Sequence, residues 1–101
     1  MERWVIFEIV ASGKMDDYNE WFEARDKRFQ ELGMARLKKY QVQGRMQRMV
    51  CVVTPEMTEE EGKQWREQYG ADEVIARLSR ERYATKAVID GTTEFFWLTT
   101  D

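Results

Sequence analysis

Apolar and polar residues follow the period of a strand at the two ends of the chain and the period of a helix between them. In the first strand, over residues 3–10, alternation places Val5, Phe7 and Ile9 on one side and Trp4, Ile6, Glu8 and Val10 on the other. Both sides are largely apolar, which is typical of a central strand that is covered on both faces.

A helix is predicted next, over residues 15–34. Its apolar stripe recurs at offsets of three and four and contains Tyr18, Trp21, Phe22, Arg25, Phe29 and Leu32. Asp16 is expected to cap the start of the helix, and Gly33 suits a left-handed end.

Two strands, over residues 35–43 and 47–54, are expected to form a hairpin around Gly44. The first is charged, as an edge strand often is, and the second is almost entirely apolar and is expected to be central. After Pro55, Thr58 and Glu61 match a capping box for a helix that ends near Tyr69. Asp72 is expected to cap a further helical stretch over residues 72–83.

The end of the chain contains the final strand, over residues 92–100, which includes three consecutive aromatic residues. Residues 87–89 fit either a short extra strand or a loop, and the sequence does not choose between the two. The order of elements is strand, helix, strand, strand, helix, strand. It predicts one α+β domain, residues 1–101, with a ferredoxin-like βαββαβ fold and both helices on one face of a four-stranded antiparallel sheet.

The second face of this sheet is expected to be apolar as well. If Val5, Phe7 and Ile9 meet the helices, the opposite side of that strand is open; in the last strand, Phe95 and Trp97 are then expected to lie on the same open side. Such a patch is larger than monomers normally expose, and a second copy of the chain is the commonest cover.

The order of elements and the aromatic terminal strand resemble the dimeric α/β-barrel superfamily, in which two ferredoxin-like subunits pack sheet against sheet. The resemblance covers nearly the whole chain. It implies a homodimer through the open sheet face and the terminal strand, with Phe95 and Trp97 in the interface, and a small apolar cavity between sheet and helices. The superfamily includes cofactor-independent monooxygenases, haem-binding enzymes, lactone isomerases and proteins of unknown activity.

The amino-acid composition excludes some of these activities for this chain. The chain has no histidine, so it offers no imidazole for haem, for metal or for a Ser-His-Asp site, and we expect neither a cofactor nor a metal. The formal charge of −3 argues against nucleic acid, and no apolar stretch is long enough to suggest a membrane span. The start of the chain lacks the features of a signal peptide, so we expect a cytoplasmic protein. Cys51 is expected to be an inert buried side chain, with a reactive thiol as the alternative.

Glu8 is the residue that most needs an explanation, because a buried carboxylate without a partner is costly. It is expected to point away from the helices, with Arg48, Lys39 or Gln41 as partner. Two interpretations remain open: a structural ion pair or rim carboxylate, and a catalytic general base or substrate anchor.

The expected function is the binding of a small hydrophobic or aromatic molecule between sheet and helices. The alternative is a cofactor-independent monooxygenase acting on an aromatic substrate. Packing alone is the default role of the aromatic residues at core spacing. The candidate ligand-binding residues are Trp4, Ile6, Tyr18, Phe22, Arg25, Tyr40, Trp65 and Trp97.

Overall fold

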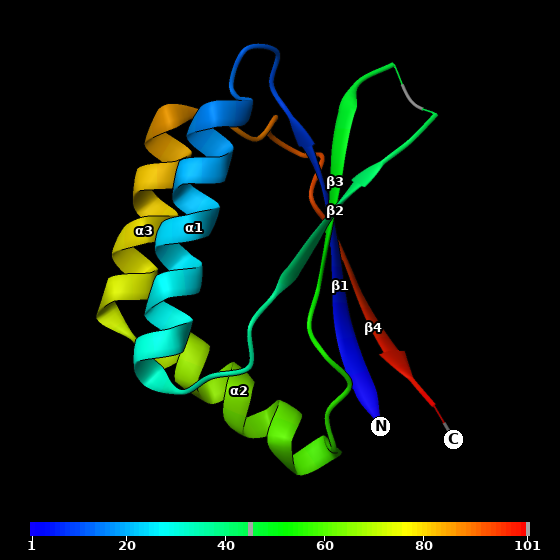
Figure 1. Ribbon diagram of the computed structural model, residues 1–101, viewed down its shortest axis with the longest axis vertical. Helices are drawn as coiled ribbons and strands as arrows, with labels where there is room; N and C mark the ends of the chain where they lie inside the picture. Colours follow the sequence, from blue (N-terminus) through cyan, green and yellow to red (C-terminus); the bar gives the residue numbers. More distant parts are fainter. Residues whose placement is uncertain (45, 101) are drawn as a thin grey trace.

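The sheet and its helices form two layers (Figure 1). The computed structural model describes residues 1–44 and 46–100. Its elements are β1 (Glu2–Val10), α1 (Met15–Leu32), β2 (Lys38–Val42), β3 (Arg48–Val53), α2 (Glu59–Ala71), α3 (Glu73–Thr85) and β4 (Glu94–Thr99). All three helices lie on one side of the sheet, with α1 and α3 side by side. The predicted α+β architecture is confirmed.

The four strands are antiparallel and lie in the order β2-β3-β1-β4. The two apolar strands, β1 and β3, are central, while the charged β2 and the terminal β4 are the edges. This is the strand order of the ferredoxin-like fold. The first and last strands pair along their length, so the two ends of the chain lie close together (Figure 1).

The helix ends follow the sequence signals with one exception. Thr58 and Glu61 form the predicted capping box of α2, and Asp72 accepts a hydrogen bond from the Ile75 amide at the start of α3. Gly33 ends α1 with φ of 68°, where a side chain would be strained. The prediction that Asp16 caps α1 is wrong, because the cap position is Lys14 and Asp16 lies within the first turn.

Residues 87–89 do not form a strand. Val88 makes an isolated bridge to Val10, supported by hydrogen bonds from the Ala11 amide to the Ala87 carbonyl (2.8 Å) and from the Ile89 amide to the Ile9 carbonyl (3.0 Å). The segment therefore runs beside the end of β1 without extending the sheet, which resolves the choice that the sequence left open.

The two sides of β1 are assigned the other way round from the prediction. Glu8 reaches Arg82 of α3, and Trp4 and Ile6 pack against the core beneath the helices, so their side of the strand faces the helical layer. Val5 and Phe7 lie on the open side. The prediction considered partners for Glu8 on the strands only, whereas a helix supplies the buried cation.

The same reversal holds for β4, whose register with β1 fixes its sides. Trp97 is opposite Trp4 and Phe95 is opposite Ile6, so both lie on the helix-facing side of the sheet. Phe96, opposite Val5, lies on the open side with Leu98. The predicted assignment of Phe95 and Trp97 to the open face is therefore wrong, since they share the side of β1 that faces the helices.

Two clusters of buried side chains form the core between the layers. One centres on Phe29 and Trp65 and includes Val52 and Ile75; the other centres on Tyr18 and contains Val50 and Leu78. The core thus fills the space between the three helices and the two central strands, while β4 lies beyond it. All six residues of β4 are exposed in the single chain.

The open side of the sheet presents an apolar surface that no described helix covers, although Val5 and Ile9 are buried within it. It spans all four strands, and we call it the open face. Its members are Val5, Phe7, Ile9, Tyr40, Val42, Met49, Cys51, Val53, Phe96 and Leu98. Phe96 and Leu98 of the terminal strand are 45% and 52% exposed, and Tyr40 on β2 is 47% exposed.

Candidate functional site

A small cavity of about 60 Å³ lies between the sheet and the helices, on the side of α2. Its walls come from β1, β4, α1, α2 and the segment before β2, so residues far apart in the sequence meet there. The lining residues are Trp4, Ile6, Arg25, Leu37, Trp65, Arg66, Tyr69 and Phe95. We call it the interlayer cavity.

The aromatic walls of the interlayer cavity are fixed by contacts with one another. The Trp4 ring lies 6.0 Å from that of Trp65 and 5.5 Å from that of Phe95, both in edge-to-face geometry. Trp65 stacks on Tyr69 at 5.3 Å, and its indole N–H donates to the Ala35 carbonyl at 2.9 Å. These contacts hold the rings in place, which suits a site for a flat apolar group.

One charged wall is Arg25, which is only 3% exposed although it carries a guanidinium. The sequence places it between Trp21 and Phe29 on the buried stripe of α1, one turn from each. Its guanidinium carbon lies 4.0 Å above the Trp21 ring, and Nη1 donates a long hydrogen bond of 3.4 Å to the Tyr69 hydroxyl. The cavity therefore has a fixed positive charge among apolar rings.

The second cationic wall, Arg66, has a partner within the chain. It approaches Glu2 at 3.5 Å and lies 3.9 Å from the Trp97 ring centre. The indole N–H of Trp97 donates to the same Glu2 carboxylate at 3.1 Å. Gly62 lies against this carboxylate, because a Cβ atom there would come 2.1 Å from a Glu2 oxygen.

A second buried polar group lies deeper, between β1, α1 and α3. Glu8 is 2% exposed and forms an ion pair with Arg82 of α3. Tyr18 is fully buried nearby. Burial, and then the negative charge of Glu8, raise the pKa of Tyr18 far above its usual value, so its hydroxyl keeps its proton at neutral pH.

Not all the predicted site residues meet. The interlayer cavity is lined by four of them: Trp4, Ile6, Arg25 and Trp65. Trp97 packs on Trp4, with the ring centres 5.0 Å apart. Tyr18 and Phe22 stack with each other on α1, with the ring centres 6.4 Å apart. Tyr40 does not belong to this group, because it is 47% exposed on the open face. The sequence reasoning missed four lining residues: Leu37, Arg66, Tyr69 and Phe95.

The predicted partners of Glu8 are also wrong. The expected partners lie on β3 (Arg48) and β2 (Lys39 and Gln41), whereas the carboxylate pairs with Arg82 of α3. A signal for this pair exists in the sequence, since Arg82 follows Ile75 and Leu78 at helical offsets and so shares their buried side. The same reasoning marks Tyr69, which is one turn after Trp65.

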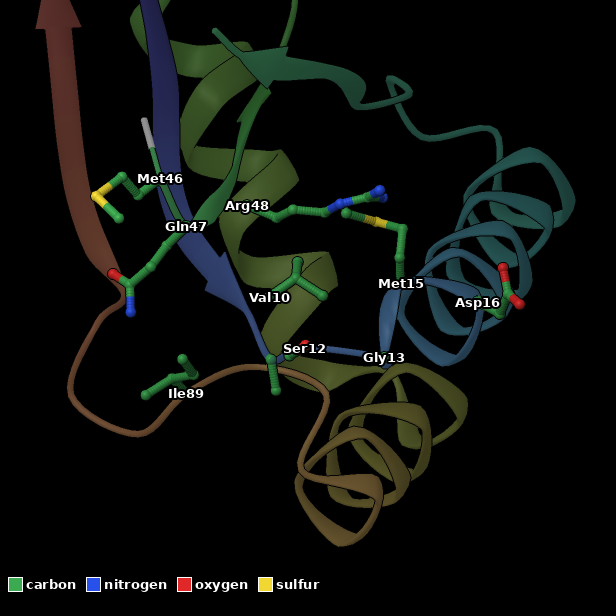
Figure 2. A pocket seen from close by; sticks show the side chains of 10 residues that line it. Val10, Ser12, Gly13, Met15, Asp16, Met46, Gln47, Arg48 and Ile89 are labelled. Atoms are coloured by element: carbon green, nitrogen blue, oxygen red, sulfur yellow. The ribbon is translucent and has the colours of Figure 1, made fainter. Parts of the chain in front are cut away.

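A larger hollow of about 570 Å³ opens at the other end of the sheet (Figure 2). Figure 2 shows side chains reaching it from the end of β1, the start of α1 and the residues before β3. Most of its lining residues are exposed: Ser12, Gly13, Asp16, Met46, Gln47, Arg48 and Ile89. It is a wide surface depression, and for this reason the smaller interlayer cavity is the better candidate site.

Other chemistry is limited in the described residues. Cys51 lies half-buried on the open face, and burial raises the pKa of its thiol, which disfavours the reactive thiolate. Within residues 1–44 and 46–100 no three carboxylate or thiol side chains gather in a metal-binding cluster. None of the helices described is long and apolar enough to cross a membrane.

The fold is shared with solved structures of low sequence identity. An uncharacterised NIPSNAP domain protein from Burkholderia xenovorans superposes with a TM-score of 0.75 at 13% identity, covering 100% of this chain and 95% of that chain. A NIPSNAP family protein from Agrobacterium tumefaciens gives 0.74 at 11% identity, with 99% and 92% covered. The chain shares the ferredoxin-like α+β fold of these structures.

One structural neighbour has a named activity. A variant of SnoaB, a cofactor-independent oxygenase from Streptomyces nogalater, superposes with a TM-score of 0.56 at 13% identity, covering 98% of this chain and 91% of that chain. No protein-family model matches the sequence, and no curated protein matches it. At these identities the comparisons establish the fold, and the site itself has to be argued from its residues.

Proposed function

We propose that the protein is a homodimer that binds a small aromatic or other apolar molecule in the interlayer cavity. The observation that carries the proposal is the lining of that cavity. Four aromatic side chains from three elements, Trp4, Trp65, Tyr69 and Phe95, converge on it with a single charged group that has no carboxylate partner in the described chain. Apolar walls with few polar groups are typical of small-molecule sites.

The dimer is supported by the open face. Phe96 and Leu98 leave about half their surface uncovered, and Phe7, Cys51 and Val53 continue the apolar surface inward. The single chain holds β4 along one edge only, so a second copy packed on the open face would stabilise the terminal strand. The proposed interface therefore contains Phe96 and Leu98, in place of the pair expected from the sequence.

The alternative function is a cofactor-independent oxygenase acting on an aromatic substrate. It is favoured by the buried Glu8, Tyr18 and Arg82, which provide a carboxylate and a protonated hydroxyl between the sheet and the helices, although none of the three lines the cavity. The likeness to SnoaB is compatible with it. Turnover of an aromatic substrate that Glu8→Gln abolishes, with binding retained, would favour this alternative.

Two measurements test the proposal. Native mass spectrometry on freshly purified protein is expected to show two chains and any small molecule that is retained. Tryptophan fluorescence during titration with 2-naphthamide, a neutral aromatic probe, is expected to change saturably, because Trp4 and Trp65 line the cavity. A monomer, or a fluorescence signal that never saturates, would count against the dimer or the pocket respectively.

A filled cavity provides the matched control for binding. Ile6→Phe adds volume inside the interlayer cavity, so it is expected to lose the fluorescence response while the protein stays folded by circular dichroism. Ile89→Phe makes the same change in a loop outside this cavity and is expected to keep the response. An unchanged response in Ile6→Phe would show that the probe binds elsewhere.

A further inference from the structure

Two arginines on helices are buried toward the sheet, and only one has an anionic partner in the described chain. Arg82 pairs with Glu8. Arg25, at 3% exposure, takes part in none of the ion pairs among residues 1–44 and 46–100. Burying a guanidinium is costly unless the group is paired and hydrogen-bonded.

The contacts that Arg25 does make leave one edge free. Its face lies on the Trp21 ring at 4.0 Å, and Nη1 reaches the Tyr69 hydroxyl at 3.4 Å. Nε and Nη2 are buried and have no hydrogen-bond partner within the described residues. These two atoms form one side of the guanidinium, with parallel N–H bonds.

Two other arginines of this chain show what that edge binds. Arg28 uses Nε and Nη2 to hold the two oxygens of Asp72, at 3.0 and 2.7 Å. Arg36 uses the same two atoms on Asp26, at 3.0 and 2.6 Å. The fork geometry matches a carboxylate bound through both oxygens. Arg25 lines the interlayer cavity and carries the same edge, which is buried and has no hydrogen-bond partner in the described residues.

We propose that the ligand of the interlayer cavity is a small aromatic or apolar carboxylic acid, with its carboxylate on the Nε and Nη2 edge of Arg25. This inference rests on the proposed function and specifies its ligand class. The apolar body lies against the rings of Trp4 and Trp65. Phe95, 59% exposed on β4, connects the cavity to the surface, so part of the ligand extends past it.

The size of the cavity agrees with this arrangement. A single water needs roughly 10–15 Å³ of such space, so about 60 Å³ holds a group the size of a carboxylate, and a larger apolar body extends past Phe95. A carboxylate buried here is also paired with a charge that the fold already holds in place. The ligand therefore supplies the acceptors that the chain does not provide for Arg25.

The test compares acids with their neutral amides by isothermal titration calorimetry. Benzoate and 2-naphthoate are expected to bind the wild-type protein at least tenfold more tightly than benzamide and 2-naphthamide. Arg25→Met is expected to remove this preference, so that each acid binds no more tightly than its amide. Lys27→Met makes the same change of charge on an exposed position of α1 and is expected to keep the preference.

Three outcomes separate the inference from the proposed function. Equal affinity for acids and amides, or a preference that survives Arg25→Met, overturns the carboxylate assignment and leaves an apolar pocket. No binding of any of the four probes overturns the proposed function as well. Arg25→Lys is a second variant in case Arg25→Met does not fold, because lysine keeps the charge without the two parallel N–H donors. We expect the ratio of acid affinity to amide affinity to fall at least fivefold in Arg25→Lys. An unchanged ratio overturns the inference.

Discussion

Glu8 of β1 and Arg82 of α3, 74 residues apart in the sequence, form an ion pair that is buried between the sheet and the helices. Their side chains are 3% and 12% exposed. The pair ties the third helix to the central strand and explains how a carboxylate is accommodated on the covered side of the sheet. Its removal is the most direct test of the assigned orientation of β1.

Glu8→Gln and Arg82→Met are each expected to lower the free energy of unfolding by roughly 3–5 kcal/mol, because each leaves a buried charge without its partner. The double variant is expected to recover much of this loss. Urea denaturation measures all three. The exposed pair Arg77 and Glu81 is the control: Glu81→Gln is expected to cost at most about 1 kcal/mol. A similarly small loss in Glu8→Gln would contradict the buried pair.

The lowered pKa of Asp72 predicts that the protein loses stability at acid pH. Its hydrogen bonds with Arg28 lower the pKa of its carboxyl from 3.8 to about 2, and the Ile75 amide contributes. Because the folded-state pKa lies below the unfolded value, the stabilisation is complete above pH 4 and is lost as the pH falls through about 2.

Asp72→Asn is therefore expected to be less stable than wild type in urea at pH 7 and to approach wild-type stability near pH 2. Asp90→Asn, on an exposed turn, serves as the control and is expected to follow the wild type throughout. A difference between Asp72→Asn and wild type that is constant from pH 7 to pH 2 would argue against the ion pair as its cause.

The raised pKa of Tyr18 predicts a loss of stability at alkaline pH. Burial and the charge of Glu8 raise the pKa of its phenol above the unfolded value of 10.0. The stabilisation is thus complete below pH 10 and is lost as the pH rises above it, since the unfolded chain ionises first. We expect ultraviolet titrations of the wild type and of Tyr18→Phe to show the same rise in phenolate absorbance until the protein unfolds, because Tyr18 does not ionise in the folded wild type.

The stability of Tyr18→Phe at neutral pH is a second test of the surroundings of this residue. The Tyr18 hydroxyl is buried without a hydrogen-bond partner in the described chain, so Tyr18→Phe is expected to be as stable as wild type or slightly more so. Thermal unfolding at pH 7 measures this. A marked loss of stability would show that the hydroxyl has a partner in solution.

Two adjacent residues of β4 test the proposed dimer with matched substitutions. Phe96→Asp places a charge on the open face and is expected to give a monomer by native mass spectrometry. Phe95→Asp makes the same change on the helix-facing side and is expected to remain a dimer while losing 2-naphthamide binding. The reverse result would restore the interface expected from the sequence, and two unchanged dimers would place the interface elsewhere.

Local patterns in the sequence were sufficient for most of the fold. The capping box at Thr58 and Glu61, the cap at Asp72 and the left-handed Gly33 each depend on a few neighbouring residues, and all three are confirmed. The strand order follows from chain connectivity and the apolar character of β1 and β3. The isolated bridge at Val88 could not be predicted, because it depends on how the loop after α3 meets β1.

The site was predicted only in part, for a related reason. Arg25 and Trp65 are recognisable from the helical period, and Trp4 and Ile6 were named as candidates although they were assigned to the wrong side. Leu37 lies in a segment without regular structure, and no period marks it. Tyr40 was included for its chemistry, but the register of β2 turns it to the open face.

The sequence by itself determined which residues share a side of each strand, because successive side chains alternate with a period of two. Only the tertiary structure decided which side the helices cover. That choice depends on contacts between elements distant in the chain, above all on Arg82 being available to neutralise Glu8. Alternation is a property of the single strand, whereas burial of a charge is stabilised only when a partner from another element reaches it.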